Sequence, residues 1–74
     1  MDDVTTRAQR IWRLRRLHQL VDAELHLDAG GVELRFLYNG MVTFRQRWPD
    51  RHSAIEAAAT KRAELEREGW MFHW

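Results

Sequence analysis

The 74-residue sequence contains no cysteine, one proline and four glycines. Without cysteine the chain can form neither a disulfide nor a thiolate metal site to reinforce a small core. No apolar run approaches the roughly 18 residues that span a membrane, and the opening residues, MDDVTTRAQR, lack the apolar stretch of a signal peptide. The sequence therefore predicts one soluble, cytoplasmic domain over residues 1–74, with no membrane partner.

Charge is distributed unevenly behind a net value of +1. Residues 1–20 carry +3, residues 21–34 carry −4, residues 35–52 carry +3 and residues 53–74 carry −1. Eleven of the twelve basic residues are arginine, which suits bidentate recognition of phosphate or carboxylate but is also typical of coding from a GC-rich genome. Two local basic zones do not make the uniformly basic profile of a dedicated nucleic-acid-binding protein.

The first third of the chain is predicted to form a long amphipathic helix from about Val4 to Leu27. Thr6 followed by Gln9 fits a capping box, and the glycine pair after residue 29 fits the helix end. On a helical wheel the apolar residues span about 200°, wider than the roughly 100° that one packing surface needs. The alternating stretch ELHLD, residues 24–28, leaves a short strand open as an alternative.

Asn39-Gly40 lies between two apolar stretches, a strong signal for a β-hairpin. A two-residue turn would mix apolar and charged side chains on both faces. A three-residue loop that includes Tyr38, with a bulge at Gly40, separates them and sets Glu33 opposite Arg45. The apolar face then holds Val32, Leu34, Phe36, Val42, Phe44 and Trp48. The bulged register, with one apolar and one basic face, is therefore the prediction.

A second helix is predicted over residues 51–68, with Asp50 as its N-cap. A Schellman C-cap at Gly69 would bring Trp70 against Leu65. The last five residues, WMFHW, alternate, so as an extended segment they add a third strand to the hairpin edge or dock onto another chain. The predicted fold is α+β: a long N-terminal helix, a two-stranded antiparallel hairpin and a second helix, packed as two layers.

The sequence offers few side chains for catalysis. Ser53 is the only serine and stands beside His52 in a predicted helix, so neither a hydrolytic triad nor a glycine-rich phosphate loop is indicated. His18, Asp22 and His26 would extend over about 12 Å of helix, too far to share one metal ion. We therefore expect no enzyme activity, cofactor, metal or small-molecule substrate.

The surplus of apolar surface predicts that the monomer is incomplete. The wide apolar arc and four tryptophans in a chain of this length favour a small self-associating protein-interaction module, a two-fold homodimer or the partner of another protein. The expected interface residues are Trp12, Leu20, Leu27, Phe72 and Trp74.

Nucleic-acid binding through the basic hairpin face is the alternative function. Its candidate residues are Arg35, Tyr38, Arg45, Arg47 and Arg51. Residues 45–59, RQRWPDRHSAIEAAA, fall in a part of the chain that resembles the small DNA-binding domains at the N-termini of tyrosine recombinases, which are related in fold to plant AP2 domains. In those domains a sheet is followed by an aromatic residue, a short turn and an alanine-rich helix. The resemblance implies DNA binding and three strands before the helix, whereas this sequence predicts two unless residues 24–28 supply another.

Overall fold

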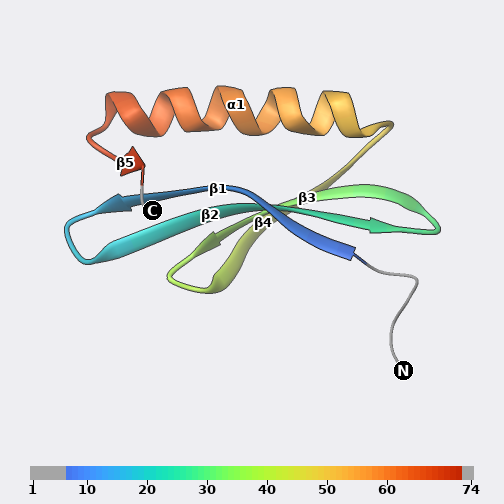
Figure 1. Ribbon diagram of the computed structural model, residues 1–74, viewed down its shortest axis with the longest axis horizontal. Helices are drawn as coiled ribbons and strands as arrows, with labels where there is room; N and C mark the ends of the chain where they lie inside the picture. The colour runs from blue at the N-terminus through green and yellow to red at the C-terminus, as the bar shows by residue number, and fades with distance from the viewer. Residues whose placement is uncertain (1–6, 73–74) are drawn as a thin grey trace.

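Five strands and one helix make up the protein, as seen in the computed structural model, which describes residues 7–72 (Figure 1). The elements are β1 (Arg7–Arg16), β2 (Gln19–Asp28), β3 (Gly31–Tyr38), β4 (Met41–Trp48), α1 (Arg51–Arg67) and β5 (Met71–Phe72). The strands form one antiparallel sheet in the order β4-β3-β2-β1-β5. The helix lies along one face of this sheet, here called the covered face, and the opposite face is the open face.

The predicted N-terminal helix is wrong, because β1 and β2 occupy residues 7–16 and 19–28, and its first residues, 4–6, lie outside the described residues. Residues 7–72 are mostly β with a single helix, so a helix-hairpin-helix or an α+β architecture with an N-terminal helix does not describe them. Trp12 and Leu14 alternate with arginines in β1, and the apolar residues of β2 alternate with acidic ones. This period of two places one set of side chains on the covered face. The strand alternative for residues 24–28 is confirmed.

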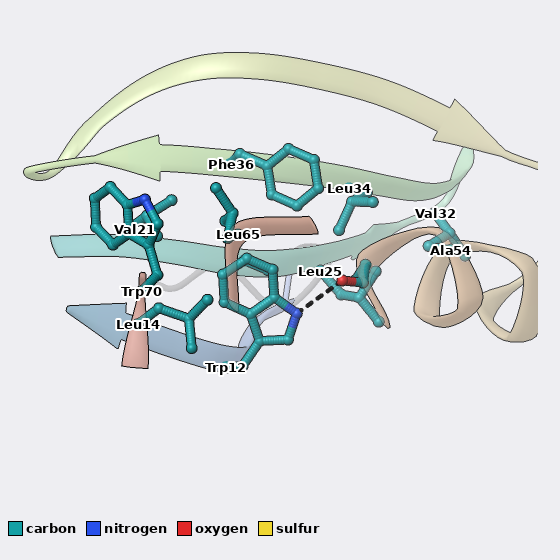
Figure 2. Packing of buried hydrophobic residues seen from close by; sticks show 12 residues of the cluster. Trp12, Leu14, Val21, Leu25, Val32, Leu34, Phe36, Ala54, Leu65 and Trp70 are labelled. Carbon is teal, nitrogen blue, oxygen red and sulfur yellow. Dashed lines mark hydrogen bonds between the residues drawn. The ribbon is translucent and has the colours of Figure 1, made fainter. Parts of the chain in front are cut away.

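The covered face supplies most of the core. Its largest fully buried side chains are Leu14, Val21, Leu25 and Leu34, which come from the three central strands (Figure 2). The helix completes the core with two buried alanines, which permit close approach to the sheet, and with Leu65. A buried hydrogen bond joins the layers, since the indole Nε1 of Trp12 donates to the carbonyl oxygen of Ala58 at 3.0 Å (Figure 2).

The hairpin of β3 and β4 closes with a two-residue turn, so the predicted three-residue loop is wrong. Asn39 and Gly40 have φ values of 53° and 86°, as a type I′ turn requires. A bulge between the pairs Leu37–Val42 and Phe36–Phe44 then restores the segregation of apolar and charged residues. The predicted bulge thus exists at a different place in the ladder.

The shifted bulge changes which charged residues face one another. Arg47 lies opposite Glu33, and Arg45 lies opposite Arg35. The predicted pairing of Glu33 with Arg45 is therefore wrong, whereas the separation of one apolar face from one charged face holds over residues 44–48.

The second predicted helix is confirmed as α1. The Asp50 carboxylate accepts a hydrogen bond from the backbone N–H of Ser53 at 2.7 Å, which is the N-cap contact. Gly69 has a φ of 101°, and the N–H of Trp70 donates to the carbonyl of Leu65 at 3.1 Å, as in a Schellman motif.

The C-terminal strand pairs with β1 rather than with the hairpin edge. The chain reverses after α1 and carries Trp70 under the helix end, where its side chain is buried. The third strand predicted for the hairpin is therefore wrong in its partner, because β1 already offers a free edge next to the helix end. Among the described residues, no helix has the length and apolar character needed to cross a membrane.

Candidate interaction site

The outermost strand β4 leaves one side of its backbone unpaired. It is eight residues long and exposed at every position except Trp48. The pairs of an antiparallel ladder alternate between hydrogen-bonded and non-hydrogen-bonded, and Tyr38–Met41 closes the turn. Counting from that pair and past the bulge, the backbone N–H groups of Arg45 and Arg47 point to the free edge. An edge of this kind is a template for another strand.

An aromatic row on the covered face ends at this edge. The rings of Trp12 and Phe36 stack with centroids 5.9 Å apart, across the small side chain of Ala23. Phe36 in turn stacks on Phe44 at 5.2 Å. Trp12 is 5 % exposed and Phe44 is 41 % exposed. The row therefore begins in the core and presents an aromatic ring to solvent at the edge strand.

A groove of about 320 Å³ lies beside Phe44, between α1 and the two strands β3 and β4. The strands contribute mostly apolar walls, and the helix contributes Thr60 and the ion pair of Lys61 with Glu64 (3.6 Å between Nζ and Oε1). Trp48 also lines the groove, and its indole Nε1 is buried without a hydrogen-bond partner among the described residues. The groove is therefore lined mainly by apolar side chains from the strands and by polar side chains from the helix.

The open face of the same two strands carries three arginines around one carboxylate. Arg35 Nε donates to Glu33 Oε1 at 2.6 Å, and Arg47 donates to both carboxylate oxygens of Asp28 at 3.4 and 3.0 Å. The hydrogen bond from Arg35 lowers the pKa of Glu33 below its ordinary value, and the charges of Arg35, Arg45 and Arg47 act in the same direction. Arg45 makes no hydrogen bond or ion pair with another described residue. It is the unneutralised cation of the group.

Elsewhere on the open face, one of the three remaining arginines forms an ion pair with a described residue. Arg13 forms a bidentate pair with Asp22 at 2.6 and 3.0 Å, which raises the pKa of Arg13. His26 Nε2 lies 2.9 Å from the carboxylate of Glu24. The arginines of the open face are Arg10, Arg13, Arg15, Arg35, Arg45 and Arg47, and its carboxylates are Asp22, Glu24, Asp28 and Glu33. The face is therefore mixed in charge, with its acidic residues on β2 and β3.

The structure does not gather the five predicted interface residues into one surface. Trp12 lies in the core, and Leu20 and Leu27 are half-buried on opposite faces of β2. Phe72 is 48 % exposed on β5, at the far side of the sheet from β4. Trp74 lies outside the described residues.

Three of the five residues predicted for nucleic-acid binding come together. Arg35, Arg45 and Arg47 form the group on the open face. Tyr38 instead belongs to the covered face, edge-on to Trp70 with ring centroids 6.1 Å apart. Arg51 begins α1, where its guanidinium donates to the side chain of Gln9 at 3.2 Å.

The histidines singled out in the sequence do not assemble into a site. His18 lies in the β1–β2 turn, and the side chains of Asp22 and His26 are engaged by Arg13 and Glu24. Within residues 7–72, no three histidine or acidic side chains group as a metal site would require. The groove and the free edge were not foreseen, because both depend on the order of strands in the sheet.

Comparison of the chain with protein-family models, curated proteins and solved structures gives no match. Within the described residues four strands precede the helix, one more than the recombinase domains would imply. The likeness around residues 45–59 therefore concerns the order of elements, and no function is taken from it.

Proposed function

We propose that this protein is an interaction module that binds an extended segment of another protein as a strand added to β4. The observation that supports this proposal is the exposure of β4 along its whole edge. The groove next to this strand offers further surface to the side chains of a bound segment. Backbone hydrogen bonds supply affinity in such complexes, and pockets for alternate side chains supply specificity. The open edge and the groove offer both kinds of contact.

The interaction surface differs from the one that the sequence predicted. Homodimerisation was expected through an over-wide apolar helix, but residues 7–16 and 19–28 are strands, and most of their apolar side chains pack within the chain itself. The apolar residues left exposed on the sheet include Met41, Val42 and Phe44 of β4. A protein partner remains the proposal, and β4 replaces the helix as its contact. A cytoplasmic location also stays a prediction.

The test is selection of random twelve-residue peptides by display against the full chain, followed by amide hydrogen exchange with a selected peptide. We expect the N–H groups of Arg45 and Arg47 to exchange rapidly in the free protein and slowly in the complex. Peptides that protect other amides, or the failure of selection to yield any peptide, would contradict strand addition at β4.

A pair of truncations provides the matched control. Phe44→Ala removes the exposed end of the aromatic row. It is expected to lower the affinity for the selected peptide by about tenfold, the scale of one interface contact worth about 1.4 kcal/mol. Met71→Ala removes a side chain that is 70 % exposed on β5. It is expected to leave the affinity unchanged, since β5 is at the other edge of the sheet.

Nucleic-acid binding is a second candidate, favoured by one observation. Arg35 and Arg45 lie directly opposite each other on the open face, an arrangement that repels unless an anion lies between them. The test is fluorescence anisotropy with labelled duplex and single-stranded DNA and RNA across salt concentrations. Affinity that falls steeply with salt and is lost in Arg45→Gln/Arg47→Gln would support this candidate, and absence of binding at low salt would remove it.

A further inference from the structure

We infer that the segment accepted by β4 alternates acidic and apolar residues, with its acidic side chains on the open face. This inference rests on the proposed function and names the chemistry of its partner. A strand added to β4 turns successive side chains to opposite faces of the sheet. One set meets the groove beside Phe44, and the other set meets Arg45 and Arg47.

The open face of β4 calls for acidic residues on the incoming strand. Arg45 forms no hydrogen bond or ion pair with a described carboxylate, and its direct neighbour across the ladder is another arginine. Arg47 forms an ion pair with Asp28, and its side chain is still half-exposed. Side chains directly opposite on neighbouring strands interact most strongly, and opposite charges there are favourable. Among the described residues, the carboxylates paired with this group are those of Glu33 and Asp28, and a new strand could add further carboxylates.

The covered face of β4 calls for apolar residues on the same strand. The ring of Phe44 ends the aromatic row at the edge, and the groove continues from it between the strand and α1. An apolar side chain opposite Phe44 would extend the row by one member and remove the exposed ring surface from water. The side chain of Trp48 lines the same groove.

A second copy of the chain fits this edge poorly. Two-fold pairing of β4 with itself over its regular part, residues 44–48, centres on Arg45, Gln46 or Arg47. These registers place Arg45 opposite Arg45, Arg45 opposite Arg47, or Arg47 opposite Arg47, and like charges in that position are destabilising. A register centred on Phe44 instead runs the bulge of each copy into the regular part of the other. Charge at an edge strand is a common protection against self-pairing.

The test uses three fluorescent nine-residue peptides in which isoleucine alternates with glutamate, glutamine or lysine. Each is titrated into the full chain at concentrations where the free peptide is monomeric. We expect the glutamate peptide to bind about tenfold more tightly than the glutamine peptide, and the lysine peptide to bind more weakly still, since two cross-strand charge pairs contribute on this scale. Amide exchange of Arg45 and Arg47 reports whether the peptide lies on β4.

The variant Arg45→Gln/Arg47→Gln separates charge from strand addition. It is expected to bind the glutamate and glutamine peptides with equal affinity. That affinity should match the one that the native chain shows for the glutamine peptide. The matched control Arg62→Gln/Arg67→Gln removes two arginines of α1 and should keep the tenfold preference.

Each contrary result has its own meaning. Equal binding of all three peptides to the native chain, with Arg45 and Arg47 protected, overturns the acidic partner and leaves strand addition standing. Binding of none of the peptides, together with failure of the display selection, overturns strand addition itself. Salt-sensitive binding of DNA or RNA without peptide binding would assign the arginines to phosphates instead.

Discussion

Two tryptophans on the covered face occupy different environments although both line the space beneath α1. Trp12 donates its indole N–H to Ala58, whereas the N–H of Trp48 is buried without a partner among the described residues. A buried donor contributes to stability only where it finds an acceptor, and without one it carries the cost of desolvation. The same substitution at the two positions therefore has different consequences.

Replacement of each tryptophan by phenylalanine tests this difference. Trp12→Phe loses the hydrogen bond and leaves a cavity in the core, so we expect the free energy of unfolding to fall by about 2 kcal/mol. Trp48→Phe removes a donor that has no partner and should cost less than about 1 kcal/mol. Urea unfolding followed by circular dichroism measures both. Equal losses would show that the bond to Ala58 contributes nothing.

Glu33 makes stability depend on pH. Its folded-state pKa lies below the ordinary 4.5, chiefly because Arg35 donates to the carboxylate. The ionised group therefore stabilises the fold above the ordinary value, and this contribution is lost as pH falls through the folded-state pKa. We expect Glu33→Gln to lower the free energy of unfolding at pH 7 by at most about 1 kcal/mol. The difference should shrink in acid below 4.5, and a difference that stays constant with pH would contradict the assignment.

At the scale of elements, the β1–β2 turn shows why sequence reasoning went wrong. Leu17 and His18 form the turn, and neither is a residue that marks turns. Leu17 has a φ of 56°, a left-handed conformation that costs a leucine about 1–2 kcal/mol. The turn therefore has no glycine, asparagine or proline to mark it, and the two strands look like one continuous segment in the sequence. The apolar residues of this segment also cluster on a helical wheel, so a helix was predicted.

The other turns and caps were predictable where their residues are diagnostic. Asn39-Gly40 marked the hairpin, and Asp50 with Gly69 marked both ends of α1. The arginines on one face of β3 and β4 followed from alternation alone. The position of the bulge did not, because Thr43 carries no bulge signal and the register depends on packing of Phe44 against Phe36. Neither the edge position of β4 nor the groove is encoded locally.

The strained turn residue gives a prediction at this scale. Leu17 is 80 % exposed, so Leu17→Gly removes little packing and relieves the left-handed strain. We expect the free energy of unfolding to rise by about 0.5–1 kcal/mol, the relief being offset in part by the greater freedom of glycine in the unfolded chain. Thermal unfolding by circular dichroism measures it. A fall in stability would mean that Leu17 makes contacts that outweigh the strain.

At the scale of the whole molecule, the sheet has two unlike edges. The β1 edge is partly closed by β5, and the approach of Trp70 to this edge is reinforced by Arg16, whose guanidinium lies 4.8 Å from the Trp70 ring centre. The β4 edge has only its bulge and two arginines as protection. The edge strand β4 is therefore open along all eight of its residues, whereas β5 covers the edge of β1 at Leu14 and Arg15.

The arginines of β4 should determine whether this strand pairs with itself. In the register centred on Gln46, Phe44 of one copy faces Trp48 of the other on the covered face, a favourable aromatic contact, while Arg45 faces Arg47 on the open face. Arg45→Glu converts both repulsive pairs of that register into attractive ones. We therefore expect this variant to form a dimer by light scattering at concentrations where the native chain is monomeric, and to protect the amide of Arg47 from exchange. Arg45→Gln, which removes the repulsion without adding attraction, should dimerise less.

Two outcomes would contradict this prediction. A native chain that already dimerises with Arg47 protected would mean that like charges do not prevent self-pairing of β4. An Arg45→Glu variant that stays monomeric would mean that β4 lacks the geometry to accept a strand.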